Sequence, residues 1–409
     1  MEQRKKKLPL FIALCYVLNF YIGFNMSASQ FVLLDMKTEF EIGSAVMAII
    51  TSASLVTSLG MSLLFSGILD KLDPKKLILI GCVVSISGSL VAGLSVSPLM
   101  TTVSYLISGV GSNILLAVPF PAMSKLDPDR ITMHVNRQQG ALTLGATIAP
   151  LIMAVLINKL GLVWRWSYYV SAGMLVLVAI GFIVSTSPGK SLDVQAIAAE
   201  TPEEKRARKR LILTPAFICM GLILGIYMVM EIGVLNYAKD YFMLELGDVL
   251  GASLCISMVR GGMTLSRLFG DRIIKNRVWL CMGSMVLSGV CVLLLAVFRI
   301  PIVSLVWCAL FGIVAGPCWP TALSMGLSLD SKESGKLSSI LMLFNNIGNN
   351  LGNVFIGACI DGLGVGNAYY VAAAFAIIGA IVVAIGVKDF RKRGFAPEGP
   401  EWMELKAKN

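Results

Sequence analysis

The sequence predicts an all-α membrane protein, with twelve transmembrane helices in two pseudo-symmetric six-helix bundles around a central cavity. Three observations support this prediction: long apolar runs, few charged residues, and short similarities that recur about 200 residues apart. Of the 409 residues, 56% are hydrophobic and 14% are charged. A soluble domain carries about 25% charged residues, so this chain has too few for a surface in water. The composition excludes a disordered chain, a disulfide scaffold and a secreted enzyme.

Twelve apolar runs are each long enough to cross the hydrocarbon core, which takes about 20 helical residues at ~1.5 Å per residue. A polar stretch midway along the chain divides them six and six. We therefore expect an N-terminal bundle at 1–186, a cytoplasmic linker at 187–211, a C-terminal bundle at 212–388 and a cytoplasmic tail at 389–409. The runs lie at 9–34, 43–69, 77–97, 99–124, 139–160, 166–186, 212–238, 249–269, 278–298, 301–327, 337–360 and 366–387.

The basic residues predict the orientation of these spans. If the N-terminus lies inside, 28 of the 34 lysines and arginines fall on the cytoplasmic side. Both termini are then cytoplasmic, and we expect the chain in a cell membrane, with the bacterial cytoplasmic (inner) membrane the expected location. The net charge of +10 is explained by this topology. We therefore expect the bilayer and a small-molecule substrate as partners, no nucleic acid, and a monomer.

Few residues are available for redox, hydrolytic or metal chemistry. The nine cysteines lie in apolar runs and form no Cys-x-x-Cys motif, which is typical of buried structural thiols. The single histidine, His134, cannot build a metal centre. No nucleotide-binding Gly-x-x-x-x-Gly-Lys-Ser/Thr motif occurs either. We expect no cofactor, no metal and no enzymatic activity.

Three short similarities occur at corresponding positions of the two predicted halves, 199 to 201 residues apart. Each match alone is weak, but three in register indicate two related six-helix repeats. Repeats of equal orientation imply a pseudo-twofold axis along the membrane normal, which suits alternating access. The matching pairs are Asp70-Lys71 with Asp271-Arg272, Phe120-Pro121 with Trp319-Pro320, and Tyr168-Tyr169 with Tyr369-Tyr370.

The loop after the second span reads Ser66-Gly67-Ile68-Leu69-Asp70-Lys71-Leu72-Asp73-Pro74-Lys75-Lys76. Together with Trp164-Arg165-Trp166 before the sixth span, it resembles the major facilitator superfamily, whose signature here is Gly-x-x-x-Asp-Arg/Lys-x-Gly-Arg/Lys-Arg/Lys. The first glycine is displaced by one position, and Asp73 replaces the second. The resemblance covers essentially the whole chain and implies a secondary transporter. It also implies gating contacts at the cytoplasmic face, against the alternative of ordinary loop charges, for Asp70, Lys71, Asp271 and Arg272.

Polar residues inside the spans indicate where a solute could bind, because polar groups rarely face lipid. Five asparagines of the eleventh span fall within an arc of about 140° at 100° per residue. We expect Asn346 and Asn349 to face the translocation path; the alternative is hydrogen bonding between helices that Gly348 and Gly352 allow to approach closely. Other candidate substrate contacts are Asn25 and Asn113, and the aromatic residues Tyr21, Tyr227 and Trp319, for which packing is the alternative role.

Arg260 in the eighth span shares one helical face with Ser253, Ser257 and Thr264. A guanidinium about 10 Å below the cytoplasmic boundary requires an anion. Glu231 in the seventh span lies at nearly the same depth, so the two can pair. Either the pair is permanent and structural, or Arg260 is shared between Glu231 and an anionic substrate while Glu231 takes up and releases the coupling proton.

The leading hypothesis is therefore a secondary active transporter, a proton-coupled symporter of a small organic anion of the carboxylate type. The alternative within the same class is an exporter or carrier of a neutral or amphipathic solute, such as a sugar or a drug-like compound, with Arg260 and Glu231 as a structural ion pair. A membrane-embedded enzyme is disfavoured because no cluster of His, Asp or Glu lies near an interface. A receptor is disfavoured because the longest loop has about 25 residues.

Overall fold

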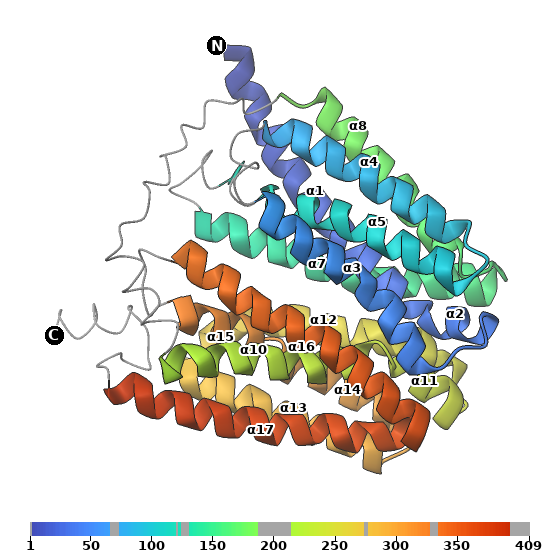
Figure 1. Ribbon diagram of the computed structural model, residues 1–409, viewed down its shortest axis with the longest axis vertical. Coiled ribbons are helices and arrows are strands. Elements are labelled where there is room, and N and C mark those ends of the chain that lie inside the picture. The colour runs from blue at the N-terminus through green and yellow to red at the C-terminus, as the bar shows by residue number, and fades with distance from the viewer. Residues whose placement is uncertain are drawn as a thin grey trace. The chain divides into compact units, whose positions relative to one another are not determined.

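The computed structural model describes residues 2–65, 73–119, 122–123, 131–186, 214–273, 277–327 and 334–392. These residues are almost entirely helical and contain no strand, which confirms the predicted fold class (Figure 1). The elements are α1 (Glu2–Phe31), α2 (Leu33–Glu39), α3 (Ser44–Phe65), α4 (Pro74–Gly93), α5 (Pro98–Ala117), α7 (Ile131–Ala154), the π-helical turn η3 (Val155–Lys159), α8 (Trp166–Val184), α10 (Pro215–Leu235), α11 (Ala238–Asp240), the π-helical turn η4 (Tyr241–Glu245), α12 (Val249–Ile273), α13 (Arg277–Val297), α14 (Pro301–Ala315), α15 (Cys318–Leu327), α16 (Ser334–Leu363) and α17 (Val365–Lys392).

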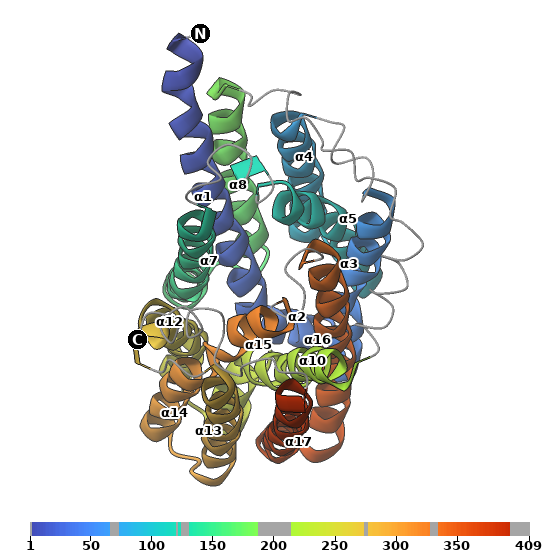
Figure 2. The ribbon, with the colours of Figure 1, turned by 90° about the vertical axis from the view of Figure 1, so that its left-hand side faces the viewer.

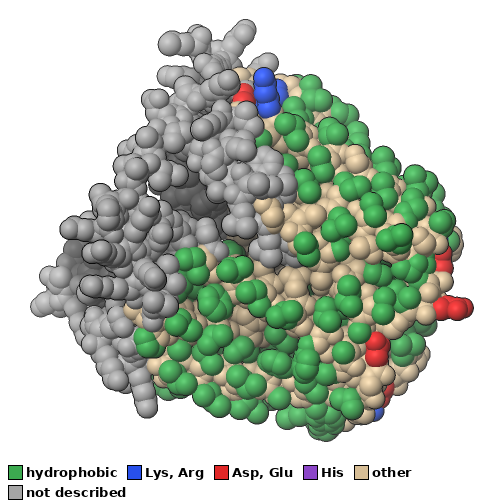
Figure 3. Space-filling view, viewed as in Figure 1, with side chains coloured by type: hydrophobic (Ala, Val, Ile, Leu, Met, Phe, Trp, Pro, Cys, Tyr) green, Lys and Arg blue, Asp and Glu red, His purple; other side chains and the backbone are tan. Residues whose placement is uncertain are grey.

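All twelve predicted segments are helical over most of their described residues, and ten helical spans are long and apolar enough to cross a membrane. The other two segments lie on α3 and α16. Helix α3 contributes a shorter apolar helix, Ser44–Ser54, within the residues searched, and the asparagines of α16 lower its apolar character. Large hydrophobic side chains are exposed along the helices, including Val56, Leu177, Ile302 and Leu351, each at least 68% exposed. Figure 3 shows the described helices largely covered by hydrophobic side chains, as expected for contact with lipid.

Several spans begin with the same local signal. Asp73, Ser97 and Thr214 each precede a proline at the first helical position, and each side chain accepts a hydrogen bond from a backbone N–H of the first turn. The side chain satisfies one of the amides that a helix start leaves unpaired, and proline loses nothing there because its missing N–H would have no partner. The sequence thus sets the starts of α4, α5 and α10 locally.

The chain divides into two compact units. Unit 1 comprises Met1–Ile42 and Val46–Ala198, and unit 2 comprises Gly43–Ala45 and Ala199–Asn409. Within unit 2, the Asp361 carboxylate accepts hydrogen bonds from the backbone amides of Ser44 and Ala45, at 2.7 and 2.9 Å. The predicted linker at 187–211 lies outside the described residues, as does most of the predicted tail, and the predicted domain limits stay predictions.

In unit 1, α1 packs against α7 and α8, and α4 packs against α5 and α8. Its hydrophobic core includes Phe11, Leu18, Cys82 and Phe182, which are fully buried. Close approach of the helices depends on glycine. A Cβ on Gly145 of α7 would lie 2.0 Å from the Phe20 carbonyl oxygen of α1. The absence of a side chain there lets the two backbones touch.

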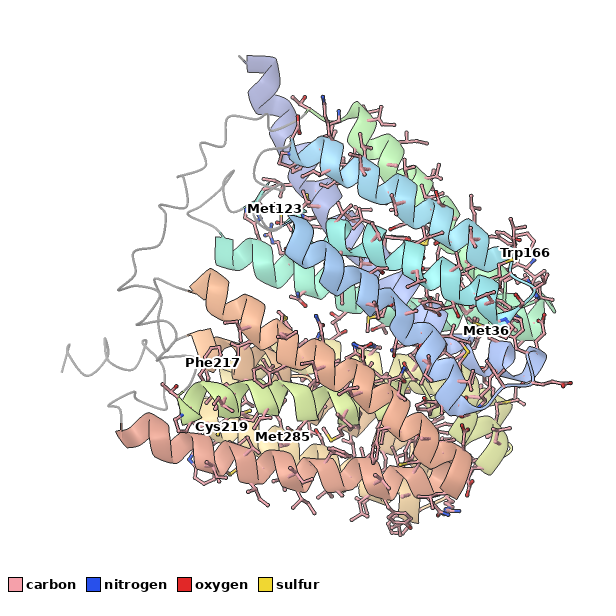
Figure 4. The ribbon with its side chains drawn as sticks, viewed as in Figure 1. Met36, Met123, Trp166, Phe217, Cys219 and Met285 are labelled. Atoms are coloured by element: carbon pink, nitrogen blue, oxygen red, sulfur yellow. The ribbon has the colours of Figure 1, made fainter. Side chains whose placement is uncertain are left out.

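In unit 2, α10 packs against α16 and α17, α12 against α14, and α13 against α17 (Figures 1 and 2). Figure 4 marks Cys219 on α10 and Met285 on α13, both buried. They lie against α17 at two glycines: a Cβ on Gly386 would lie 3.1 Å from the Cys219 Cβ, and one on Gly379 would lie 2.4 Å from the Met285 methyl. The two glycines of α17 therefore leave room for the side chains of α10 and α13.

The two units use the same glycine contacts. Gly109 of α5 meets the Ser54 carbonyl of α3, and Gly312 of α14 meets the Val259 carbonyl of α12, each with a Cβ position 2.0 Å from the oxygen. Gly145 of unit 1 likewise corresponds to Gly348 of α16, whose Cβ would lie 2.1 Å from a carbonyl oxygen of α10. Both pairs of glycines are 203 residues apart. This agreement supports the internal repeat independently of the three sequence similarities.

Hydrogen bonds near the helix ends repeat as well. The Tyr169 hydroxyl donates to the Gly93 carbonyl at the end of α4, at 2.8 Å. In unit 2, the Tyr370 hydroxyl donates to the Ala296 carbonyl near the end of α13, at 3.3 Å. The donors are 201 and the acceptors 203 residues apart. The repeated Tyr-Tyr pairs noted in the sequence therefore begin α8 and α17 in equivalent positions.

An ion pair joins the end of α2 to the start of α8 in unit 1. Arg165 donates to both carboxylate oxygens of Glu39, at 2.6 and 3.0 Å, and the Trp164 indole N–H donates to the same carboxylate at 2.6 Å. Arg165 also donates to the Ser95 carbonyl after α4. The Trp-Arg-Trp run therefore links three segments by hydrogen bonds: the end of α2, the residues after α4 and the start of α8. These bonds, led by the Arg165 guanidinium, lower the pKa of Glu39.

Substituting Gly348→Ala tests the contact between α10 and α16. The added Cβ would lie 2.1 Å from the Gly225 carbonyl oxygen, so the helices must separate, at a cost of about 1–3 kcal/mol. Gly283→Ala in α13 is the matched control, because a Cβ there meets nothing within 4 Å. We expect a lower thermal unfolding temperature in detergent for the first variant and an unchanged or higher one for the control. Equal temperatures would contradict the packing described.

The stability contributed by Glu39 should depend on pH. Its pKa is lower in the folded state, so the carboxylate stabilises the fold above the unfolded-state pKa of about 4.3, and this stability is lost as pH falls through the folded-state value. The stability difference between wild type and Glu39→Gln should therefore be present at pH 7 and vanish in acid. Glu41→Gln is the control, because Glu41 forms no ion pair with the described residues. If the stability difference between wild type and Glu39→Gln did not change with pH, the ionised Glu39 carboxylate would not be its cause.

Candidate functional site

A charged pair lies buried inside unit 2. The Nη1 atom of Arg260 on α12 lies 3.0 Å from Oε1 of Glu231 on α10, and the two side chains are only 4% and 6% exposed. The sequence predicts both residues at nearly the same depth, and the structure joins them directly. They are 29 residues apart along the chain and meet because α11, η4 and a short turn connect α10 to α12.

Glu231 occupies the most enclosed part of the unit. Every residue from 227 to 242 is buried, and α10 contacts α15, α16 and α17. A carboxylate in such surroundings is costly unless it is paired and hydrogen-bonded. Arg260 supplies the pairing charge, so the position of α12 relative to α10 is coupled to this interaction.

Helix α12 presents a polar face around Arg260. Ser253 and Ser257 are buried on it, and the Thr264 hydroxyl donates to the Arg260 carbonyl at 2.9 Å. The Met263 sulfur lies 3.8 Å from Nη1 of Arg260. The predicted common face of the four polar residues is therefore occupied by buried or half-buried side chains.

Three further groups act electrostatically on this pair: Tyr227 one helical turn before Glu231, Arg267 two turns after Arg260, and Cys318 at the start of α15. The Nε of Arg267 donates to the Gly316 carbonyl at 3.2 Å. Among these five groups there is one carboxylate and there are two guanidinium groups. The site is therefore cationic around a single anion, which favours the approach of a second anion.

The asparagines of α16 divide into two groups. Asn345 accepts a hydrogen bond from the Trp319 indole at 2.8 Å, and Asn353 accepts one from the Asn236 amide at 2.9 Å. These outer residues hold α16 to α15 and α10, as the interhelical alternative proposes. Asn346 and Asn349 are half-buried, and Asn349 has no hydrogen bond to the described residues. Asn346 accepts a hydrogen bond from the Asn345 amide at 3.4 Å, and the two central residues stay predictions as substrate contacts.

The glycines beside the asparagines let α16 approach α10 closely, as the sequence suggests. Gly348 touches Gly225, and a Cβ on Gly352 would lie 2.7 Å from the Val229 side chain. The glycine side of α16 therefore faces α10. Trp319 is half-buried and its indole is already bonded to Asn345, so its ring position is set by α16.

The remaining predicted site residues fall in different surroundings. Tyr21 is 3% exposed and belongs to the hydrophobic core of unit 1, which favours a packing role. Tyr227 is fully buried. Asn25 and Asn113 are half-buried in unit 1 and stay predictions as substrate contacts. Asp70 and Lys71 lie outside the described residues, as do the side chains of Asp271 and Arg272, which end α12.

Several contacts were not anticipated from the sequence. The bond between Trp319 and Asn345 crosses between two helices, and so do the bonds from Asn236 and Tyr237 to Asn353. The sequence does indicate one pair of neighbouring side chains. Tyr227 and Glu231 are four residues apart, and this spacing places both on one face of α10. Hydrogen bonds between distant segments leave no such spacing.

The sequence profile of the Major Facilitator Superfamily matches residues 12–330, so the chain belongs to this family. A bacterial homologue of the human lysosomal transporter Spinster, in an inward-facing and occupied conformation, superposes with a TM-score of 0.74 at 14% identity, covering 95% of this chain and 98% of that one. At this identity the likeness shows the fold alone. The family and the fold identify a multi-pass membrane transporter rather than an enzyme.

Curated relatives match this chain only in part. An uncharacterised MFS-type transporter of Mycobacterium tuberculosis is 25% identical over 156 residues, which are 37% of this chain and 27% of that protein. The lincomycin resistance protein LmrB of Listeria monocytogenes is 25% identical over 175 residues, 42% of this chain and 36% of that protein. The matches thus span about a third of these relatives' length.

Separating the two partners of the buried pair should be more harmful than removing both. Arg260→Met leaves a buried carboxylate without its charge partner, and Glu231→Leu leaves a buried guanidinium, each at about 3–5 kcal/mol. The double variant leaves neither, so its unfolding temperature should exceed that of either single variant. Thermal unfolding of the four proteins in detergent measures this coupling. Additive losses would show that the two residues do not interact energetically.

Proposed function

We propose that this chain is a secondary active transporter that works by alternating access and carries a small organic anion together with a proton. The observation that carries the proposal is the buried pair of Arg260 and Glu231 in unit 2. Family membership supports transport, and the charges of the site support the substrate class.

The chemistry of the pair suits an exchange of anions. A guanidinium offers two parallel N–H donors that match a carboxylate, and Glu231 engages Arg260 through one oxygen and one nitrogen. A substrate carboxylate could replace Glu231 without changing the charge beside Arg260. Protonation of Glu231 neutralises the carboxyl that is displaced, so one proton would accompany one monovalent anion. Substrate binding and proton uptake are thus linked at one residue.

Neutral polar groups would complete the substrate contacts in unit 2. Asn346 and Asn349 are half-buried, and amides can donate to or accept from an uncharged part of a solute. Trp319 lies beside them through its bond to Asn345. We assign the anionic end of the substrate to Arg260 and the remainder to this asparagine face.

A second candidate is export of a neutral or amphipathic compound, with the charged pair as a permanent structural element. Two observations favour it: the pair is closed, and one relative is named as a lincomycin resistance protein. A permanent pair would be retained for the specificity of packing and would not exchange with the substrate. The two candidates differ in whether Arg260 must offer a planar fork to the solute.

The topology proposed from the basic residues completes the assignment. Both termini would face the cytoplasm of a bacterial cell, in its cytoplasmic membrane, with the chain acting as a monomer. Asp70, Lys71, Asp271 and Arg272 would then lie at the cytoplasmic ends of their spans, where charge pairing can gate the path.

Arg260→Lys tests the anion proposal. Lysine keeps the charge but loses the bidentate fork, so carboxylate transport should fall at least tenfold, the loss of about 1.5–3 kcal/mol expected for a charged hydrogen bond. The assay is counterflow of labelled lactate, succinate or benzoate in proteoliposomes. Arg299→Lys is the matched control, because Arg299 also pairs with a glutamate, Glu245, but at the ends of η4 and α13.

Two results would count against the proposal. Counterflow of a carboxylate that is equal for Arg260→Lys and wild type would show that the arginine does not bind the anion. Counterflow of lincomycin or a sugar by wild type, with none of the carboxylates, would establish the second candidate.

A further inference from the structure

Tyr227 carries a buried hydroxyl that forms no hydrogen bond of regular geometry with the described residues. Its side chain is fully buried. The hydroxyl already interacts with the Glu231 carboxylate, both through the charge of that carboxylate and as a weak hydrogen-bond neighbour.

Helix geometry places the two side chains together. Tyr227 and Glu231 are four residues apart on α10, and neighbours at this spacing lie on one face. The Cα–Cβ bonds of a helix tilt toward its N-terminus, so the Glu231 side chain leans over the turn that carries Tyr227. A small change in the Glu231 side chain is enough to bring its carboxyl group to the hydroxyl.

An unsatisfied buried hydroxyl is costly, and this cost favours a partner in another state of the protein. A buried polar group without a hydrogen bond loses the solvation that it had in water, whereas phenylalanine would fill the same space at no such cost. In the state described, Glu231 is committed to Arg260. The hydroxyl therefore gains a partner if Arg260 is withdrawn from Glu231.

Other titratable groups also act on these residues. Arg267 acts on both Tyr227 and Arg260, and Cys318 lies near both Tyr227 and Glu231. Arg267 is anchored through its Nε to the Gly316 carbonyl, and the Cys318 sulfur contacts the Cys281 sulfur at 3.9 Å.

We propose that Tyr227 is a positioning residue that takes over Glu231 when Arg260 leaves it, through a hydrogen bond between the phenol hydroxyl and the carboxyl group. The proposal rests on the proposed function, since the substrate anion is what withdraws Arg260. Glu231 then alternates between two partners, Arg260 in the empty site and Tyr227 in the loaded site. The carboxyl group is hydrogen-bonded in both, so the exchange leaves no buried carboxyl group unpartnered.

Tyr227→Phe removes only the hydroxyl and can be placed in two backgrounds. In the wild type the hydroxyl forms no regular hydrogen bond, so the variant should unfold at the same temperature or slightly higher. Arg260→Met imitates withdrawal of the guanidinium without any ligand. In that background the hydroxyl holds Glu231, and Tyr227→Phe should lower the unfolding temperature by about 2 °C. The sign of the effect therefore reverses between the backgrounds.

Tyr241→Phe is the matched control. Tyr241 is also fully buried on unit 2, but its hydroxyl donates to the Leu295 carbonyl. Its loss should lower the unfolding temperature equally in both backgrounds. An equal effect of Tyr227→Phe in both backgrounds would overturn the proposal and make Tyr227 a packing residue.

Infrared spectroscopy gives a readout that a packing role would not move. In Arg260→Met, the stretching band of the protonated Glu231 carboxyl, identified by its loss in Glu231→Gln, should shift when Tyr227→Phe is added, because the hydrogen bond disappears. An unmoved band would contradict the proposal.

If Arg260→Met does not fold, the loaded state of the otherwise wild-type protein serves instead. Benzoate or succinate should stabilise Tyr227→Phe less than wild type, with a dissociation constant raised about fivefold, as for one hydrogen bond. An unchanged constant would overturn the role of Tyr227 alone. Failure of the proposed function is distinguishable, since then no carboxylate stabilises the wild type and Arg260→Lys is without effect.

Discussion

A guanidinium buried within a membrane-spanning helix must have an anion beside it, and the organisation of unit 2 around α10 and α12 follows from this requirement. Arg260 meets it with Glu231, which lies in the most enclosed stretch of the unit. The cost of separating two charges in a medium of low polarity makes this contact an all-or-none interaction. A transporter needs an element with two discrete states, and under the proposed function the buried pair would provide one through exchange of its anion.

The scaffold that holds the pair is built twice. Gly109 and Gly145 of unit 1 recur as Gly312 and Gly348 of unit 2, each letting two helix backbones touch. Unit 1 carries no charged pair at a matching depth among its described ion pairs; Glu39 and Arg165 lie at the ends of α2 and α8 instead. The repeated packing is therefore shared by both halves, whereas the buried charges belong to one.

Prediction from the sequence succeeded where a property is local or periodic. The apolar runs, the Asp-Pro, Ser-Pro and Thr-Pro helix starts and the depth of Arg260 and Glu231 each follow from spacing along one segment. The wheel of asparagines placed all five on one arc and singled out Asn346 and Asn349, but it could not name the partners of the others. Asn345 bonds with Trp319, and Asn353 bonds with Asn236 and Tyr237, which come from other segments of the chain. Tyr21 was a candidate contact because it is aromatic, yet it packs in a core formed by four helices.

The sequence by itself determined the class of protein: its apolar runs, sparse charges and repeated motifs require a helical membrane protein of two related halves. It also determined that a buried arginine and a glutamate occur at one depth. The tertiary structure alone decided which polar groups are already satisfied. A hydrogen bond depends on the position of two atoms to within a few tenths of an ångström. Asn353 has a partner, Asn236, that lies more than 100 positions away in the sequence, whereas the Tyr227 hydroxyl has no partner in regular geometry among the described residues.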